Sequence, residues 1–224
     1  MRIISKHASI LATLAILGAG SSACWAQNSE AAPRWEIGGL GGGGFYSSAS
    51  VSGPTGSGDV GIKNSVAVGA FVGNDVYKRL GGELRYEFMP GDLKVSSGGS
   101  EATFSGQSHA LHYDFLFHFA PKGSRVRPFV SAGGGVKIYQ GTGKATVTQT
   151  LSSLALLTNT HQTSGLGVFG AGVKAQVASH IMLRFEVQDF MTPFPKQVIA
   201  PAPGAKISSL LNEIVFLAGL GITF

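Results

Sequence analysis

The stretch Glu213-Ile-Val-Phe-Leu-Ala-Gly-Leu-Gly-Ile-Thr-Phe224 decides the fold. Its apolar side chains occupy every second position: Ile214, Phe216, Ala218, Leu220, Ile222 and Phe224. Successive side chains of a β-strand point to opposite faces, so the stretch predicts a strand with one wholly apolar face. We place this last strand over residues 211–224. Its other face carries Glu213 and the small Gly219 and Gly221.

The same alternation recurs upstream, in segments of about ten residues separated by turns. It is clear over residues 83–88, where Leu84, Tyr86 and Phe88 alternate with Glu83, Arg85 and Glu87. Such segments predict eight strands, over residues 34–46, 64–76, 83–88, 111–118, 127–140, 166–177, 183–188 and 211–224. The sequence therefore predicts an all-β protein with a single folded domain.

The predicted connections alternate in length. Residues 47–63, the polar stretch from Pro90 to Ser100, residues 141–162 and residues 193–206 form long loops, whereas the three others are short turns. We expect a short helix within the third long loop, near Leu151–Leu157. Alternation of long and short connections is typical of a membrane barrel with extracellular loops and periplasmic turns.

Composition narrows the class. Only 13% of the residues are charged and 33 of the 224 are glycine, which argues against a disordered polar chain. No run of Lys or Arg forms a basic patch, so we expect no nucleic-acid partner. Beyond the first 26 residues no uninterrupted apolar stretch is long enough for a membrane-spanning helix. A chain of this kind can enter a membrane only as a closed barrel.

The beginning of the chain has the pattern of a cleavable signal peptide over residues 1–26. Arg2 and Lys6 precede an apolar run, and small residues lead to Cys24-Trp-Ala26. Residues 27–33 then form a periplasmic lead-in, and residues 34–224 the barrel domain. Cys24 is the only cysteine, so the processed chain would contain no disulfide and no thiolate metal site. A lipoprotein cleavage before Cys24 is disfavoured because Ser21 stands where an aliphatic residue is usual.

The apolar face is aromatic on strand after strand, so we expect it to meet lipid and the charged face to point inward. An eight-stranded barrel is just wide enough for its side chains to fill it. Buried charges need partners, which predicts a network of ion pairs instead of an open pore. Glycines on the inward face, among them Gly170, Gly172, Gly219 and Gly221, would make room for long side chains. The expected network consists of Glu36, Glu83, Arg85, Glu87, His112, Asp114, Lys137, Lys174, Arg184, Glu186 and Glu213.

Aromatic residues should also mark both borders of the bilayer. Near the periplasmic ends we expect Trp35, Tyr77, Phe119 and Phe224. Near the outer ends we expect Tyr46, Phe88, Phe104, Tyr139 and Phe190.

On its terminal strand and strand pattern, the chain over residues 34–224 resembles the small outer-membrane β-barrel family, which includes the membrane domain of outer-membrane protein A. The resemblance implies an eight-stranded antiparallel up-and-down transmembrane β-barrel in the bacterial outer membrane. It also implies that Phe216, Leu220, Ile222 and Phe224 form the signal read by the barrel-assembly machinery. Periplasmic chaperones, outer-membrane lipids and lipopolysaccharide are the partners that go with such a protein.

Two sequence motifs resemble binding sites but have a simpler interpretation as parts of strands. Gly165-Leu-Gly-Val-Phe-Gly170 matches a dinucleotide-binding pattern but does not lie between a strand and a helix. His109 and His112 are three residues apart, so on a strand they face opposite sides and do not share a metal. We therefore expect no cofactor and no metal.

We expect a structural or surface-exposed barrel without catalysis, whose long loops are available to bind an extracellular ligand. An outer-membrane lipid deacylase or acyltransferase is an alternative, with Ser105, Ser108 and His109 on one strand, but no spacing singles these residues out. An adhesin and a narrow pore are further alternatives, whereas a wide porin is disfavoured by the strand count.

Overall fold

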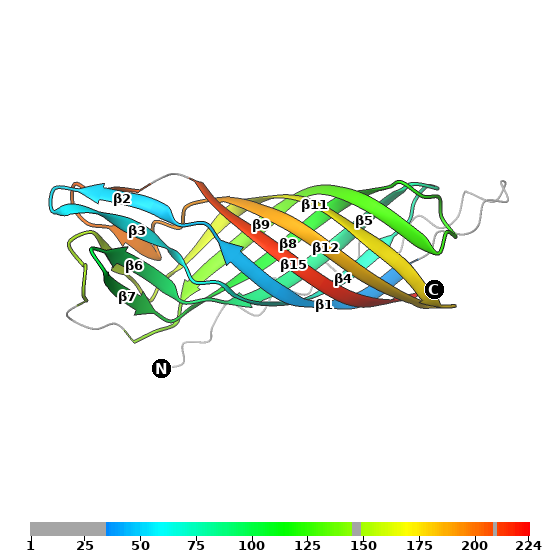
Figure 1. Ribbon diagram of the computed structural model, residues 1–224, viewed down its shortest axis with the longest axis horizontal. Coiled ribbons are helices and arrows are strands. Elements are labelled where there is room, and N and C mark those ends of the chain that lie inside the picture. The colour runs from blue at the N-terminus through cyan, green and yellow to red at the C-terminus, as the bar shows by residue number, and fades with distance from the viewer. Residues whose placement is uncertain (1–34, 145–148, 208–209) are drawn as a thin grey trace, which may run out of the picture. The chain divides into compact units, whose positions relative to one another are not determined.

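The computed structural model describes residues 35–144, 149–207 and 210–224. The predicted signal peptide and lead-in lie outside this part of the chain. Within it, eight strands close into an antiparallel barrel in the order β1-β15-β12-β11-β9-β8-β5-β4 (Figure 1). The predicted eight-stranded up-and-down barrel is confirmed. No helix in the described ranges is long and apolar enough to cross a membrane.

The barrel strands are β1 (Trp35–Tyr46), β4 (Ser65–Asn74), β5 (Leu80–Pro90), β8 (Gly106–His118), β9 (Val126–Gly141), β11 (His161–Ala178), β12 (Ile181–Pro193) and β15 (Leu210–Thr223). Closure joins the first of them to the last, with Ile37 opposite Ile222 and Gly43 opposite Phe216. Beyond the register, the backbone N–H groups of Trp35 and Phe224 each donate to the other residue's carbonyl at 3.0 Å. The closed ring has no free edge, which satisfies the backbone of every strand in lipid.

Several strands are longer than the alternation predicts. β8 begins at Gly106 and not at residue 111, and β11 begins at His161 and not at residue 166. The added residues are mostly polar or glycine, so they lack the apolar alternation that marks the rest of each strand. Their pairing is nevertheless regular, with His161 opposite Gln140 and Gln107 also opposite Gln140.

The long connections are not loops, so the predictions of a loop over residues 47–63 and of a helix near Leu151–Leu157 are wrong. They contain β2 (Ala49–Gly53), β3 (Gly56–Ile62), β6 (Leu93–Ser97), β7 (Ser100–Phe104), β10 (Ala155–Leu157), β13 (Ile199–Pro201) and β14 (Lys206–Ile207). A five-stranded sheet has the order β14-β2-β3-β6-β7, and β10 pairs with β13. Gly98 and Gly99, both with positive φ, close the β6–β7 hairpin, as a two-residue type I′ turn requires.

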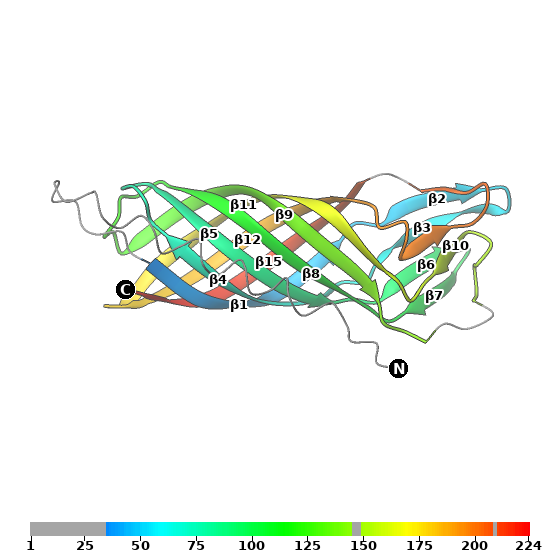
Figure 2. The same cartoon turned by 180° about the vertical axis from the view of Figure 1, so that it is seen from behind.

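We call these seven strands and their connections the cap. Figures 1 and 2 both show it beyond one end of the barrel, away from the C-terminal end of β15. The cap has an apolar core in which Val51, Val60 and Val95 are fully buried. Strand alternation explains it: valine, leucine and isoleucine point into the core, while serine, glycine and charged residues point outward. The opposite end of the barrel carries the three short connections 75–79, 119–125 and 179–180, and we call it the short-turn end.

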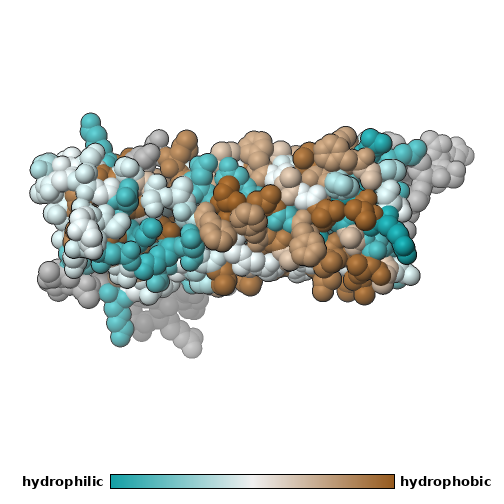
Figure 3. Space-filling model, viewed as in Figure 1, coloured by the Kyte–Doolittle hydropathy of each residue, from teal (hydrophilic) through white to brown (hydrophobic). Residues whose placement is uncertain are grey.

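On the face seen in Figure 3, apolar side chains gather over the barrel strands and are fewer over the cap. Phe115, Phe169, Phe185 and Phe216 are all more than half exposed, as lipid-facing side chains of a membrane barrel are. The aromatic border at the cap end differs from the prediction, because Phe104, Tyr139 and Phe190 are at most 8% exposed. Phe104 and Tyr139 pack in the cap core and Phe190 packs inside the barrel.

Candidate functional site

All eleven charged residues expected inside the barrel are buried, none of them more than 7% exposed. Seven strands supply them. Strands β1, β5 and β8 supply Glu36, then Glu83, Arg85 and Glu87, then His112 and Asp114. The other five are Lys137 on β9, Lys174 on β11, Arg184 and Glu186 on β12, and Glu213 on β15. Each lies on the inward face because alternate residues of every strand point into the lumen.

Glu83 is the centre of this network. Its carboxylate accepts hydrogen bonds from Lys174 Nζ at 2.6 Å, from Arg85 Nη2 at 2.6 Å and from Arg184 Nη2 at 3.0 Å. Lys174 also donates to Glu36 at 2.7 Å. One carboxylate thus joins three cations from three other positions in the barrel wall, and Lys174 extends the chain of contacts to β1.

Glu186 is a second carboxylate in contact with Arg85 and Arg184. Arg85 Nη1 donates to Glu186 Oε1 at 2.7 Å, and Arg184 Nη2 donates to Glu186 Oε2 at 2.9 Å. Arg85 is therefore shared between Glu83 on its own strand and Glu186 on β12, on the other side of the lumen. Such two-sided guanidinium contacts hold opposite walls together more specifically than a lysine could.

His112 lies between two carboxylates. Its Nδ1 is 2.8 Å from Asp114 Oδ1 and its Nε2 is 3.1 Å from Glu87 Oε2. Only the doubly protonated ring has two N–H donors, so the ring carries a positive charge where both carboxylates are ionised. That charge belongs in the network, because six of the eleven residues are carboxylates and only four are lysine or arginine.

Lys137 and Glu213 form a separate ion pair nearer the cap. Lys137 is fully buried and its ammonium lies 5.1 to 5.4 Å from the ring centroids of Tyr46, Tyr139 and Phe190. The Tyr46 hydroxyl is 3.4 Å from the same ammonium. Aromatic faces attract a desolvated cation, so the pair is enclosed on several sides.

The interior also contains an apolar cluster, which the expected network of ion pairs does not include. Phe71, Val168, Phe190, Val215 and Leu217 are among its members, and all are at most 3% exposed. The Phe71 ring stacks on the guanidinium of Arg184, with its centroid 4.3 Å from Cζ. The cluster was not predicted, because the expected interior rested only on the charged residues of the inward face.

Two polar contacts in the lumen were also missed. Arg127 pairs with Asp75 at the short-turn end, and Gln188 Nε2 donates to Asp114 Oδ2 at 3.1 Å. The alternation contains the signal for both, because Arg127 has the same parity as Lys137 on β9 and Gln188 the same parity as Glu186 on β12. Asp75 lies in a turn, where parity predicts nothing.

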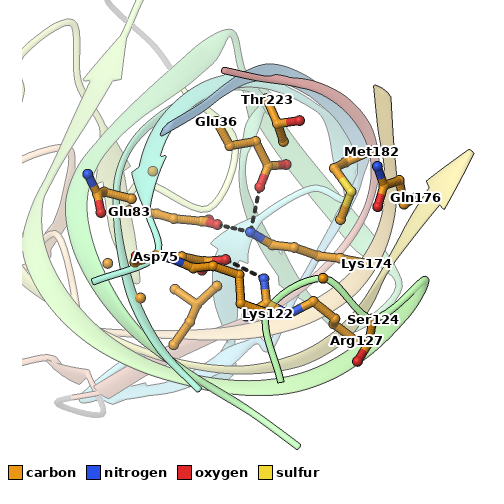
Figure 4. A pocket seen from close by; sticks show the side chains of 16 residues that line it. Glu36, Asp75, Glu83, Lys122, Ser124, Arg127, Lys174, Gln176, Met182 and Thr223 are labelled. Atoms are coloured by element: carbon orange, nitrogen blue, oxygen red, sulfur yellow. Dashed lines mark hydrogen bonds and ion pairs between the residues drawn. The ribbon is translucent and has the colours of Figure 1, made fainter. Parts of the chain in front are cut away.

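A small cavity opens at the short-turn end, with a volume of about 30 Å³ (Figure 4). Figure 4 shows Lys174 between Glu36 and Glu83, and Lys122 beside Asp75. Arg127 also lines it, and its Nε and Nη2 have no hydrogen-bond partner. A volume of this size holds a few water molecules, which would satisfy such groups.

Inward glycines provide the space for these side chains. A Cβ on Gly219 would lie 3.2 Å from Cγ of Arg184 and 2.6 Å from Cδ2 of Leu40. A Cβ on Gly221 would lie 2.9 Å from Cγ of Glu36. The charged side chains therefore occupy room that alanine at these positions would take.

The residues weighed for catalysis or ligand binding are scattered. Ser108 is buried and points inward to Tyr46, whereas His109 points outward, where Tyr86 and Gln107 contact its ring nitrogens. His112 faces the opposite side from His109. Residues 165–170 of the glycine motif lie within β11. In the described ranges, no group of three or more His, Cys, Asp or Glu side chains is arranged to hold a metal ion.

The four residues of the expected assembly signal lie on the outward face of β15 and at its end. Phe216, Leu220, Ile222 and Phe224 are 53% to 70% exposed. They form one apolar stripe next to β1, on the strand that closes the barrel.

The eight-stranded barrel agrees with what comparison with known proteins finds. The sequence model of the family described as outer membrane protein beta-barrel domain matches residues 11–222. No curated protein is significantly similar. The outer membrane protein OprG of Pseudomonas aeruginosa is 13% identical, with a TM-score of 0.52 over 84% of this chain and 95% of OprG. Neisserial surface protein A is 14% identical, with a TM-score of 0.48 over 85% of this chain and 97% of that one. At such identities the likeness is one of fold alone.

Proposed function

Because the chain belongs to the outer-membrane protein β-barrel domain family, we propose that its barrel is a closed anchor that presents the cap at the bacterial cell surface. The protein would be integral to the outer membrane and would have a structural or binding role without catalysis. The cap would face outward and the short-turn end would face the periplasm. This orientation follows the usual placement of long and short connections in outer-membrane barrels.

The observation that carries the closed anchor is the filled lumen. Ion pairs centred on Glu83 cross the barrel, the Phe71 cluster fills the space beside them, and the cap core lies beyond the Lys137–Glu213 pair. The cavity at the short-turn end has room for only a few water molecules. An ion crossing the barrel would have to break several buried ion pairs, and that would cost several kcal/mol for each uncompensated charge.

Planar-bilayer recording tests the closed anchor. We expect the purified protein to insert without large, stable conductance steps. A Glu83→Ala variant should conduct more than the wild-type protein if any residual current passes through the lumen. Large and stable conductance of the wild-type protein, with a folded barrel on unboiled gels, would contradict the proposal and favour the narrow pore.

Single-cysteine labelling tests the orientation. In a Cys24→Ser background, a cysteine at Lys196 in the cap should react with a membrane-impermeant maleimide on intact cells. A cysteine at Ser179 in a short turn should react only after the outer membrane is permeabilised. The reverse pattern would place the cap in the periplasm.

The surface role is supported by the build of the cap. Its five-stranded sheet is held by an apolar core, and its exposed side chains are mostly serine, threonine, glycine and lysine. A preordered polar surface loses less conformational entropy on binding than a flexible loop does. We therefore assign the extracellular ligand, adhesin-like or otherwise, to the cap surface, with lipopolysaccharide as its membrane neighbour.

Assembly is proposed to depend on the stripe that ends at Phe224. Deleting Phe224 should lower the amount of folded barrel in outer membranes. The protein that periplasmic chaperones deliver to the barrel-assembly machinery would then lack the last residue of the signal that the machinery reads. Heat-modifiable migration of the membrane fraction measures it. An outward control on the same strand is Ala218→Ser, which leaves the four stripe residues in place and should assemble normally.

Lipid hydrolysis is the enzymatic alternative. Purified protein should release no fatty acid from lipopolysaccharide. Release that is abolished by Ser108→Ala or by His109→Ala would overturn the non-catalytic part of the proposal.

A further inference from the structure

Cations gather unevenly at the short-turn end. The connection 75–79 contains Lys78 and Arg79, and the connection 119–125 contains Lys122 and Arg125. Asp75 is the one carboxylate in these two connections, and Arg127 pairs with it. The third connection, 179–180, is Ser-His. Among the three described connections, the positive charge of lysine and arginine therefore lies in two, 75–79 and 119–125.

Hydrogen bonds hold the two cationic connections together. The Lys122 N–H donates to the Lys78 carbonyl at 2.9 Å, and the His118 N–H donates to the Arg79 carbonyl at 2.8 Å. The Lys122 ammonium donates to the Asp75 carbonyl at 2.7 Å. Because β5 pairs directly with β8, the connections are neighbours, and these bonds fix them as one rim.

Exposed apolar side chains lie in and beside the same connections. Val76, Tyr77, Phe119 and Val126 are 54% to 64% exposed. Tyrosine and tryptophan are enriched at the boundary between hydrocarbon and headgroups. Arg79 and Arg125, in the same two connections, are exposed as well.

We propose that this rim, which we call the basic sector, binds the phosphate headgroups of anionic glycerophospholipids. Its main contacts are Arg79 and Arg125, with Lys78 and Lys122 adding positive charge. A guanidinium matches two phosphate oxygens at once, and the apolar side chains next to it contact the same lipid's glycerol and first methylenes. A hydrophilic anionic polymer such as peptidoglycan would gain nothing from those apolar neighbours. The inference rests on the proposed function in one respect only: the proposed orientation places the basic sector at the periplasmic leaflet of the outer membrane.

Lipid selectivity tests the basic sector. The full protein is reconstituted in phosphatidylcholine vesicles that contain a trace of spin-labelled phosphatidylglycerol or of spin-labelled phosphatidylcholine. The fraction of each labelled lipid whose motion the protein restricts is then measured by electron spin resonance and compared. We expect the wild-type protein to prefer phosphatidylglycerol. A cation at a membrane surface contributes a factor of up to about five, so Arg79→Gln with Arg125→Gln should remove most of the preference. High salt should remove it as well, because the contacts lie at the surface.

Two matched variants sharpen this experiment. Arg79→Lys with Arg125→Lys keeps the charge and should retain part of the preference. Lys196→Gln with Lys206→Gln removes the same charge from the cap and should leave the preference unchanged. Heat-modifiable migration confirms that each variant is folded.

Equal binding of both lipids by the wild-type protein would overturn the proposal, and so would an equal loss in the cap variant. If the Gln variant instead lost binding to isolated peptidoglycan sacculi, with lipid selectivity intact, the basic sector would be a sacculus contact and the lipid proposal would be wrong. The vesicle assay does not depend on orientation. A failure of the maleimide test would therefore change the leaflet and leave the lipid result standing.

Discussion

The barrel and the cap use the same alternation in opposite senses. In the barrel, Phe216 faces outward while Glu213 and Lys137 are buried. In the cap, Val60 and Val95 are fully buried, whereas Asp59 and Lys94, which precede them on the same strands, are more exposed. The period of two tells which side chains share a face. Whether that face is inside depends on the surroundings, because lipid selects apolar side chains and water selects polar ones.

Strands β9 and β15 cross the border between the two regions. Along the inward face of β15, Leu211 lies in the cap core, Glu213 follows it, and Val215 and Leu217 lie in the barrel cluster. The Lys137–Glu213 pair thus separates two apolar clusters. The difference between cap and barrel can be tested by variants that affect one region and not the other.

The largest effect is expected from the buried network. Glu83→Gln should lower the free energy of unfolding by about 3–5 kcal/mol, because it leaves Arg85, Lys174 and Arg184 without a full counter-charge. Urea unfolding in vesicles measures it. The control is Glu101→Gln, which removes an exposed carboxylate paired with Lys63 in the cap and should change stability little. Equal losses in both variants would mean that burial of the network does not matter.

The next effect belongs to the cap core. Leu93→Ala should cost about 2–5 kcal/mol, confined to the cap, because Leu93 is 2% exposed within that core. Hydrogen exchange should become faster in β2, β3 and β6 and stay slow in the barrel. Leu84→Ala, on the lipid-facing surface, is the control that should leave cap exchange unchanged. Faster exchange throughout the barrel would show that the cap and barrel unfold together.

A smaller effect distinguishes inward from outward glycines. Gly219→Ala should destabilise the barrel by about 1–3 kcal/mol, because its Cβ would approach Leu40 and Arg184. Gly41→Ala faces outward with nothing within 4 Å and should be neutral or stabilising. Thermal migration shifts on gels compare the two. Similar behaviour of both variants would show that the lumen has more free space than its packing indicates.

The smallest effect is electrostatic and lies in the cap. The hydrogen bond and charge of Lys63 hold the pKa of Glu101 below its ordinary value. A lowered pKa means that the contribution of this carboxylate to stability is present above the ordinary pKa and is lost as pH falls through the lowered one. Carbon-detected NMR titration should show the pKa of Glu101 rising towards its ordinary value in Lys63→Met. An unchanged pKa would remove the ion pair from the description of the cap.

Much of the barrel was predictable because its alternation is regular. The strands around Leu84, Leu111 and Phe185 and the closing strand all lie where the period of two predicts them, and the eleven charges share the inward parity. The ends of the strands were less predictable. Residues such as Gly106 and His161 extend β8 and β11 through backbone pairing, to which their own side chains contribute no apolar signal.

The cap was not predicted because its strands are short and their apolar residues few. Val51 and Val60 come from one connection, Val95 from another and Ile199 from a third, so no single segment contains enough apolar surface to form a core. The core exists only when the closed barrel brings the connections together at one end. Phe104 and Tyr139 were assigned to the lipid border for the same reason, since nothing local tells an aromatic residue whether lipid or another connection lies beside it.

The sequence by itself determined the number of barrel strands, the barrel and the set of inward charges, because a period of two is a local property of each strand. The tertiary structure alone decided which charges meet, such as Glu83 with Arg184 and Lys137 with Glu213, because these pairs are 101 and 76 residues apart. Their pairing depends on register and closure across the lumen. The same closure turned four polar connections into a folded cap, since burial of apolar side chains from distant segments requires that their ends first be held together.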